Sequence, residues 1–119
     1  EGSGYFANAR LNRQQARDSA LSLLQEAAAD ANASQTAVEE ANAAIQTMAD
    51  YTLSEANIEN LVTAKGYQDC VAFLNENSIS VVVDNSGAPL AEADIAKISE
   101  IVTEETGLTA SQIKIIEAS

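Results

Sequence analysis

The side chains considered for chemistry in this sequence are the carboxylates and the single thiol, and the chain contains no histidine. Without histidine, the Ser-His-Asp and Cys-His arrangements that activate a nucleophile cannot form. Cys70 is the only cysteine, so it can make neither an intramolecular disulfide nor a thiolate–imidazole zinc site. These absences exclude histidine-based catalysis and the commonest structural metal site.

Two pairs of adjacent glutamates, Glu39 with Glu40 and Glu104 with Glu105, are the remaining candidates for general acid–base catalysis. Neighbouring residues on a helix point about 100° apart and do not face each other. With 18 acidic residues in the chain, adjacent acids also arise by chance. We therefore interpret these pairs as solvated helix faces and Cys70 as a small, half-buried strand residue, and we expect no enzyme activity and no cofactor.

The three arginines have an informative spacing. Arg10, Arg13 and Arg17 lie three and four residues apart, so they share one face of a helix. Residues 1–24 sum to +1 (three bases, two acids), whereas residues 25–119 sum to -13 (three bases, sixteen acids). Two interpretations are open: a solvated face that balances acids elsewhere, or a docking face for anionic lipid head groups or an acidic partner.

The overall charge opposes nucleic-acid binding. Six basic residues against 18 acidic ones give a formal charge of -12. Affinity for nucleic acids comes largely from lysines and arginines that displace counterions from phosphates. KH-type RNA-binding modules share the order of elements predicted below, but the sequence lacks their Gly-x-x-Gly loop.

Alanine and β-branched residues divide the chain into two parts. Residues 1–50 hold 14 alanines, which favour helix, and residues 51–119 hold nineteen Val, Ile or Thr, which favour strand. Apolar residues at steps of three and four predict a helix from about Phe6 to Asp30. A break near residues 30–34, ending in an N-cap serine, predicts a second helix. We expect residues 1–51 to form an N-terminal helical extension.

Residues 52–119 predict a compact module of the α+β class with the order α-β-β-α-β. Thr52 and Glu55 can form a capping box for a helix that Gly66 ends, and the pattern leaves open whether this helix continues the preceding one. The later elements are predicted as two strands, a helix between an N-cap and a glycine stop, and a last strand: Cys70–Leu74, Ile79–Val83, Ala91 to Gly107, and Ile113–Ile116.

The last helix is expected to turn its apolar side toward the sheet, through Ile95, Ile98, Ile101 and Val102. Its N-cap position falls on Ala91, which has no side-chain acceptor for the free amide groups of the first turn. We therefore expect serine or threonine at this position to stabilise the fold by roughly 1 kcal/mol.

The hairpin register decides which strand side chains point inward, because a shift of one residue exchanges the two faces. We expect a three-residue loop, Asn75–Asn77, which places on the core face Val71, Phe73, Ile79, Val81 and Val83. A two-residue turn would bury Cys70, Ala72 and Leu74 instead. In the expected register, the open face of the sheet carries Ala72, Leu74, Ser80 and Val82, and this face is either a partner interface or an uneventful surface patch.

Several segments resemble the stage III sporulation protein AH family of endospore-forming bacteria. They are Tyr5–Arg10, Ile58–Tyr67 and Leu90–Ile98, followed by Glu100–Val102 and Thr106–Gly107. The resemblance runs from about Gly4 to Glu117, and it is the order and spacing of the segments together that make it specific.

The resemblance implies a protein of the mother cell whose domain lies in the space between the mother-cell and forespore membranes. There it would bind stage II sporulation protein Q, which reaches across from the forespore, and the two would form part of a channel. The α-β-β-α-β module is similar to the ring-building domains of type III secretion and flagellar basal-body ring proteins, which implies assembly into a ring.

The same resemblance implies an N-terminal transmembrane anchor outside this sequence, since no window of 18 apolar residues occurs in it and it begins at Glu1.

Outside the arginine face, identical subunits each carry -13 and repel one another. We therefore expect the isolated chain to be a monomer that needs its partner, the membrane or high salt to oligomerise. The alternatives are a ring-forming component of another secretion system, or a protein-interaction module without a role in sporulation.

Overall fold

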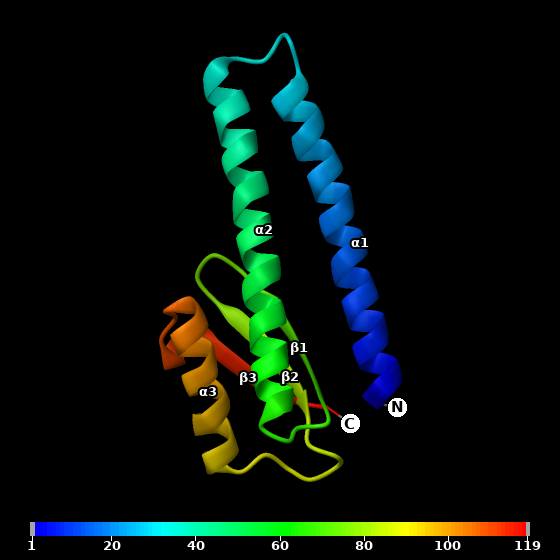
Figure 1. Cartoon of the computed structure of the whole chain (residues 1–119), viewed down its shortest axis with the longest axis vertical. Helices are drawn as coiled ribbons and strands as arrows, with labels where there is room; N and C mark the ends of the chain where they lie inside the picture. Colours follow the sequence, from blue (N-terminus) through cyan, green and yellow to red (C-terminus); the bar gives the residue numbers. More distant parts are fainter. Residues whose placement is uncertain (1, 119) are drawn as a thin grey trace.

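Two long helices set the length of the molecule (Figure 1). The computed structural model describes residues 2–118, and its principal extents are 55 × 29 × 20 Å. Helix α1 spans Gly2–Ala29 and helix α2 spans Gln35–Ala64. Between them the chain reverses direction, and the Ser34 hydroxyl accepts a hydrogen bond from the Ala37 N–H at 3.1 Å. The predicted break and its N-cap serine are confirmed.

Helix α2 is continuous through the point where a new helix was predicted to begin. Thr52 is not a cap, because its hydroxyl donates to the Met48 carbonyl oxygen, 2.9 Å away, within the helix. The carboxylate of Glu55 binds elsewhere, as described below, so the predicted capping box is wrong. The predicted boundary between residues 1–51 and 52–119 consequently falls inside α2. The division of the chain into two domains at this boundary stays a prediction.

The remaining elements form a three-stranded sheet and a third helix. The strands are β1 (Asp69–Leu74), β2 (Ile79–Asp84) and β3 (Ile113–Glu117), and the helices are α3 (Glu92–Thr106) and a short 3-10 turn, η1 (Ala110–Gln112). The sheet order is β1-β2-β3, with β1 antiparallel and β3 parallel to β2. From the second half of α2 onward, the α-β-β-α-β order and the α+β class are confirmed.

Glycines end two of the helices, as the sequence predicts. Gly66 and Gly107 have φ values of 108° and 78°, in the left-handed region that side chains with a Cβ atom disfavour. The Gly107 N–H closes α3 by donating to the Thr103 carbonyl at 2.8 Å. Each glycine lets the chain leave its helix directly into the next connection.

The hairpin register differs from the one expected. Leu74 pairs with Ile79, and the Asn75 N–H donates to the Ser78 carbonyl oxygen at 2.8 Å, so the turn itself holds two residues. The expected three-residue loop is therefore wrong, and the core face carries Cys70, Ala72 and Leu74, with Ile79, Val81 and Val83 opposite them.

The main core lies between this face of the sheet and helices α2 and α3. It includes Ile58 and Val62 from α2 and, from α3, Ile98, Ile101 and Val102. Ile95 was expected among them, but it is 39% exposed, so that part of the prediction is wrong. None of the described helices combines the length and the apolarity needed to cross a membrane.

A second, smaller core covers the opposite face of the sheet. Phe6 and Ala9 from the first turns of α1 pack with Val71 and Val82. The face that was expected to be open is therefore partly covered by α1, and β1 and β2 carry apolar side chains on both faces.

Candidate functional site

The three arginines of α1 face α2 and the outer edge of β1. Arg17 binds the Glu55 carboxylate with two nitrogens, at 2.6 and 2.7 Å. One turn earlier, Arg13 Nη1 donates to Glu59 Oε2 at 2.7 Å, and a further turn back Arg10 pairs with Asp69. The spacing that put the arginines on one helical face therefore aligns them with a row of carboxylates in the same chain.

The same side chains hydrogen-bond the outer edge of β1. The carbonyl oxygens of Cys70 and Ala72 accept from Arg10 at 3.2 Å and from Arg13 at 2.6 Å. On α2, the carboxylate of Glu59 accepts from the Ala72 N–H at 2.9 Å, and that of Glu55 accepts from the Leu74 N–H at 2.7 Å. Main-chain groups that would recruit another strand are thus occupied by side chains. This edge is closed to strand addition, whereas β3 forms the other edge of the sheet.

Glu55 is the most buried charged residue of this network, which we call the arginine–carboxylate clamp (Arg10, Arg13, Arg17, Glu55, Glu59 and Asp69). Its side chain is 1% exposed and lies 3.4 Å from Arg13 in addition to its two bonds with Arg17. The hydrogen bond from Arg17 to Glu55 raises the pKa of Arg17, against the opposing effect of burial. A buried carboxylate is tolerated only when it is paired and hydrogen-bonded. Because α1 supplies the arginine that pairs with Glu55, docking of α1 stabilises the contact between α2 and β1.

The clamp gives the arginine face an acidic partner inside its own chain. Each of the three arginines is paired with a carboxylate of its own chain. Contact of Arg10, Arg13 and Arg17 with a membrane or another protein stays a prediction. Sequence reasoning missed Glu55 and Glu59 as their partners, although these two acids are four residues apart on one helix, the same spacing as Arg13 and Arg17. The equal spacing of the two arginines and the two glutamates was the signal that could have predicted this pairing.

The four residues expected to form one sheet interface do not share a face. Ala72 and Leu74 point into the main core, whereas Val82 lies on the opposite face beneath α1 and is 3% exposed. Ser80, on the same face as Val82, is half-buried. The register shift explains the difference, and no single patch is built from these positions.

A groove of about 580 Å³ lies between α1 and α2, beyond the clamp. Its walls are mostly apolar, and its lining comprises Leu21 and Gln25 from α1, Ile45, Met48, Ala49 and Leu53 from α2, and Arg17, Asp18 and Thr52 at the clamp. Arg17 also donates to the Thr52 hydroxyl at 3.0 Å, and both residues line the end of the groove next to the clamp.

Three of the residues considered for catalysis, Cys70, Glu39 and Glu105, are either buried in the core or hydrogen-bonded to an amide side chain. Burial raises the pKa of the Cys70 thiol to about 12, so it is not a reactive thiolate near neutral pH. Glu39 accepts a hydrogen bond from Gln35, and Glu105 accepts one from Asn57. Across residues 2–118, no cluster of Cys, Asp and Glu side chains is arranged to hold a metal ion.

A second polar contact fixes the start of α3. The Tyr67 hydroxyl donates to Asp94 Oδ1 at 2.6 Å, and the other oxygen of Asp94 accepts from the Ala91 N–H at 2.8 Å. Burial, together with this hydrogen bond, raises the pKa of Tyr67 to about 12. The bond from Tyr67 lowers the pKa of Asp94.

Comparison with known protein families assigns residues 1–115 to the family described as SpoIIIAH-like protein. The chain belongs to the SpoIIIAH-like protein family. The resemblance stated from the sequence is thereby confirmed, and this family points to a scaffold role rather than an enzymatic one.

Two solved structures share the fold of this SpoIIIAH-like chain. One is a chain of the SpoIIQ–SpoIIIAH pore-forming complex, with a TM-score of 0.85 and 18% identity, covering 95% of this chain and 96% of that one. The other is EscJ of the enteropathogenic E. coli type III secretion system, with a TM-score of 0.57 and 24% identity, covering 64% of this chain and 51% of that one. A search of curated proteins found no match.

Proposed function

We propose that this chain is a structural subunit of the channel that joins mother cell and forespore during endospore formation. In this proposal it binds stage II sporulation protein Q (SpoIIQ) in the space between the two membranes and assembles into a ring. The observation that carries the proposal is the shared fold, over 95% of the chain, with a chain of the SpoIIQ–SpoIIIAH pore-forming complex.

The firm docking of α1 is consistent with a scaffold. The clamp fixes α1 against the α-β-β-α-β module, and rigid docking of elements is what a subunit needs to hold a constant angle to its neighbours in a ring. The likeness to EscJ supports a ring-building use of the module. The same proposal includes an extracytoplasmic location, which family membership supports, and an anchor in the mother-cell membrane.

A calorimetric titration tests the partner. The purified chain is titrated with the extracytoplasmic domain of SpoIIQ from the same genome, and we expect saturable binding. The control is an unrelated acidic domain of similar size. Repeating the titration at high salt separates a specific interface from general charge attraction. Absence of heat and of co-migration in gel filtration at micromolar concentrations would contradict the proposed partner.

A second candidate function is a ring subunit of a different secretion system. The likeness to EscJ favours it, although that likeness covers 64% of this chain, against 95% for the sporulation complex. The two candidates make different predictions in the same titration, because only the sporulation channel requires SpoIIQ. A chain that forms rings without binding SpoIIQ would favour this alternative.

A further inference from the structure

The two long helices extend beyond the sheet as an arm, which we define as residues 18–53 and whose end nearest the sheet still packs Tyr51 against the main core (Figure 1). The arm begins immediately after Arg17, the last arginine of the clamp, and includes the turn between α1 and α2. All of its residues are described, and Ala41 is the only one of them that is buried. Two helices that bury so little between them gain little stability from their own packing.

The groove between the helices lies in this arm. Leu21, Ile45 and Met48 are only half-buried within it, and Leu53 at its margin is 65% exposed. An apolar groove of this kind, lined by residues at helical spacing from two helices, fits the apolar side of a third helix.

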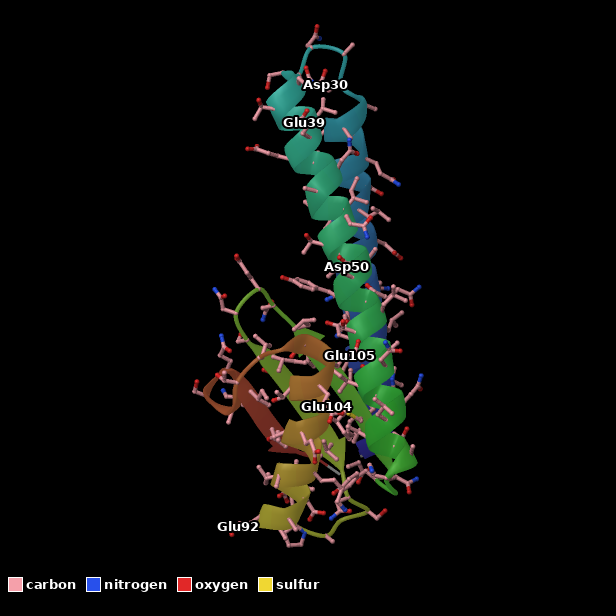
Figure 2. The ribbon with its side chains drawn as sticks, turned by 60° about the vertical axis from the view of Figure 1, so that its left-hand side comes forward. Asp30, Glu39, Asp50, Glu92, Glu104 and Glu105 are labelled. Carbon is pink, nitrogen blue, oxygen red and sulfur yellow. The ribbon has the colours of Figure 1, made fainter. Side chains whose placement is uncertain are left out.

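The charge of the arm restricts what can lie there. The arm carries six acidic residues and no lysine or arginine: Asp18, Glu26, Asp30, Glu39, Glu40 and Asp50. Asp18 is the one among them that lines the groove, and Arg17, which lines the end of the groove next to the arm, is paired with Glu55. Figure 2 shows Asp30, Glu39 and Asp50 at separate levels along the arm. An occupant with acidic flanks, or a membrane rich in anionic lipid, would be repelled along the whole length of the arm.

We propose that the groove of the arm is a docking site for a basic amphipathic helix of a partner protein. The apolar side of that helix packs on Leu21, Ile45, Met48 and Leu53, and its lysines and arginines lie beside the acids of the arm. A second copy of this chain is not the occupant, because two arms would bring six acids against six. The proposal is independent of SpoIIQ binding and adds a site that the family assignment does not define.

The single methionine of the chain supplies a direct reporter, because Met48 lines the groove. With a carbon-13 label on the methionine methyl group, its one NMR signal reports the surroundings of the groove in the intact chain. The probe is a helical peptide of about 14 residues, roughly 21 Å long, with leucines on one side and lysines on the other. We expect the Met48 signal to shift saturably, and the affinity to fall severalfold from about 50 mM to about 500 mM NaCl.

Two matched variants separate the groove from the acidic surface around it. Leu53 and Leu23 are similarly exposed, at 65% and 67%, but only Leu53 lines the groove. We expect Leu53→Ser to weaken peptide binding roughly tenfold, because a leucine contact is lost, and Leu23→Ser to change it less than about twofold. Both positions are on the surface, so both variants should retain the circular dichroism spectrum of the parent chain.

A second peptide, with the same leucines but glutamates in place of the lysines, tests the charge. We expect no shift of the Met48 signal with this peptide. Equal effects of the two peptides, an unmoved Met48 signal with the lysine peptide, or equal effects of Leu53→Ser and Leu23→Ser would each overturn the proposal. A concentration-dependent dimer that buries Met48 in the chain alone would also overturn it, because the groove would then serve self-association.

Discussion

At the scale of single residues, Glu55 joins three elements of the fold. Its carboxylate accepts from Arg17 of α1 and from the Leu74 N–H of β1, while the residue itself belongs to α2. The side chain is almost fully buried, and these partners offset the free-energy cost of burying a carboxylate. Removing it would leave the Leu74 N–H without its acceptor and Arg17 with the Thr52 hydroxyl in place of a carboxylate.

We therefore predict that Glu55→Ala lowers the free energy of unfolding by about 3 kcal/mol, the cost typical of breaking a buried ion pair. Urea denaturation followed by circular dichroism measures the change. The matched control is Glu39→Ala, an exposed glutamate of the same helix, for which we expect a change within about 0.5 kcal/mol. Equal stability of the two variants would show that the clamp does not hold α1 in place.

The pair of Tyr67 and Asp94 predicts a dependence of stability on pH. The hydrogen bond from Tyr67 lowers the pKa of Asp94 in the folded chain, so this contribution to stability is present above the ordinary carboxyl pKa. It is lost as the pH falls through the lowered pKa. Tyr67→Phe removes the bond, so the parent chain should be more stable than this variant at about pH 6, and the difference should be smaller at about pH 3, below the ordinary carboxyl pKa.

Urea denaturation at the two pH values measures this difference. Tyr5→Phe serves as the control, since Tyr5 is 43% exposed and the described residues give its hydroxyl no carboxylate partner. A difference between the parent chain and Tyr67→Phe that is unchanged at low pH would mean that the carboxylate is not the stabilising acceptor.

At the scale of elements, the start of α3 is only half capped. Asp94 accepts from the Ala91 N–H, but Ala91 has no side-chain oxygen to accept from the first turn. Ala91→Ser supplies that oxygen and completes a reciprocal pair of hydrogen bonds. We predict a gain of roughly 1 kcal/mol, seen as a rise of a few degrees in the thermal midpoint.

Ala91→Val is the matched control for this substitution, because it changes the same position without adding an acceptor. Differential scanning calorimetry of the three proteins gives the comparison. If the serine variant melted no higher than the parent chain, the N-cap of α3 would have to lie at another residue.

Most helix and strand boundaries could be predicted because particular residues mark them. Ser34 signals the start of α2, and Gly66 and Gly107 signal where helices end. The continuity of α2 was left open because Thr52 and Glu55 match a capping pattern that the local sequence alone cannot reject. The partners that occupy Glu55 lie 38 residues earlier, on α1, and 19 residues later, on β1.

The hairpin register was mispredicted for a physical reason. A strand covered on one face alternates apolar and polar residues, and that alternation fixes its register. Here β1 and β2 have apolar residues on both faces, because α1 packs Phe6 against Val71 and Val82. The prediction of the register then depended on the assumed loop length alone. The sequence of the two strands does not reveal that α1 covers their second face.

At the scale of the whole molecule, α1 is part of the structure that holds the sheet. It covers one face, closes the edge of β1 and pairs with the buried Glu55. The arginine face could be predicted from spacing, but its internal role depends on a fold that brings α1 beside α2 and β1. The groove was not predicted, because its lining comes from two helices that are distant in sequence rather than from any single segment.

The net charge of the chain opposes association between its copies. Each chain carries -12 and the arginines that offset its acids are largely occupied within it, so free copies repel one another at low salt. We therefore predict that copies assemble only with a partner, a membrane or salt that screens or complements this charge. Assembly of this chain is thereby expected to depend on partner binding.

Sedimentation velocity of the chain at low salt, alone and mixed with the extracytoplasmic domain of SpoIIQ, tests this claim most directly. The account predicts a monomer of 12.5 kDa for the chain alone and a heavier species containing both proteins in the mixture. Stable oligomers of the chain alone at low salt, or a mixture that sediments as two separate monomers, would contradict it.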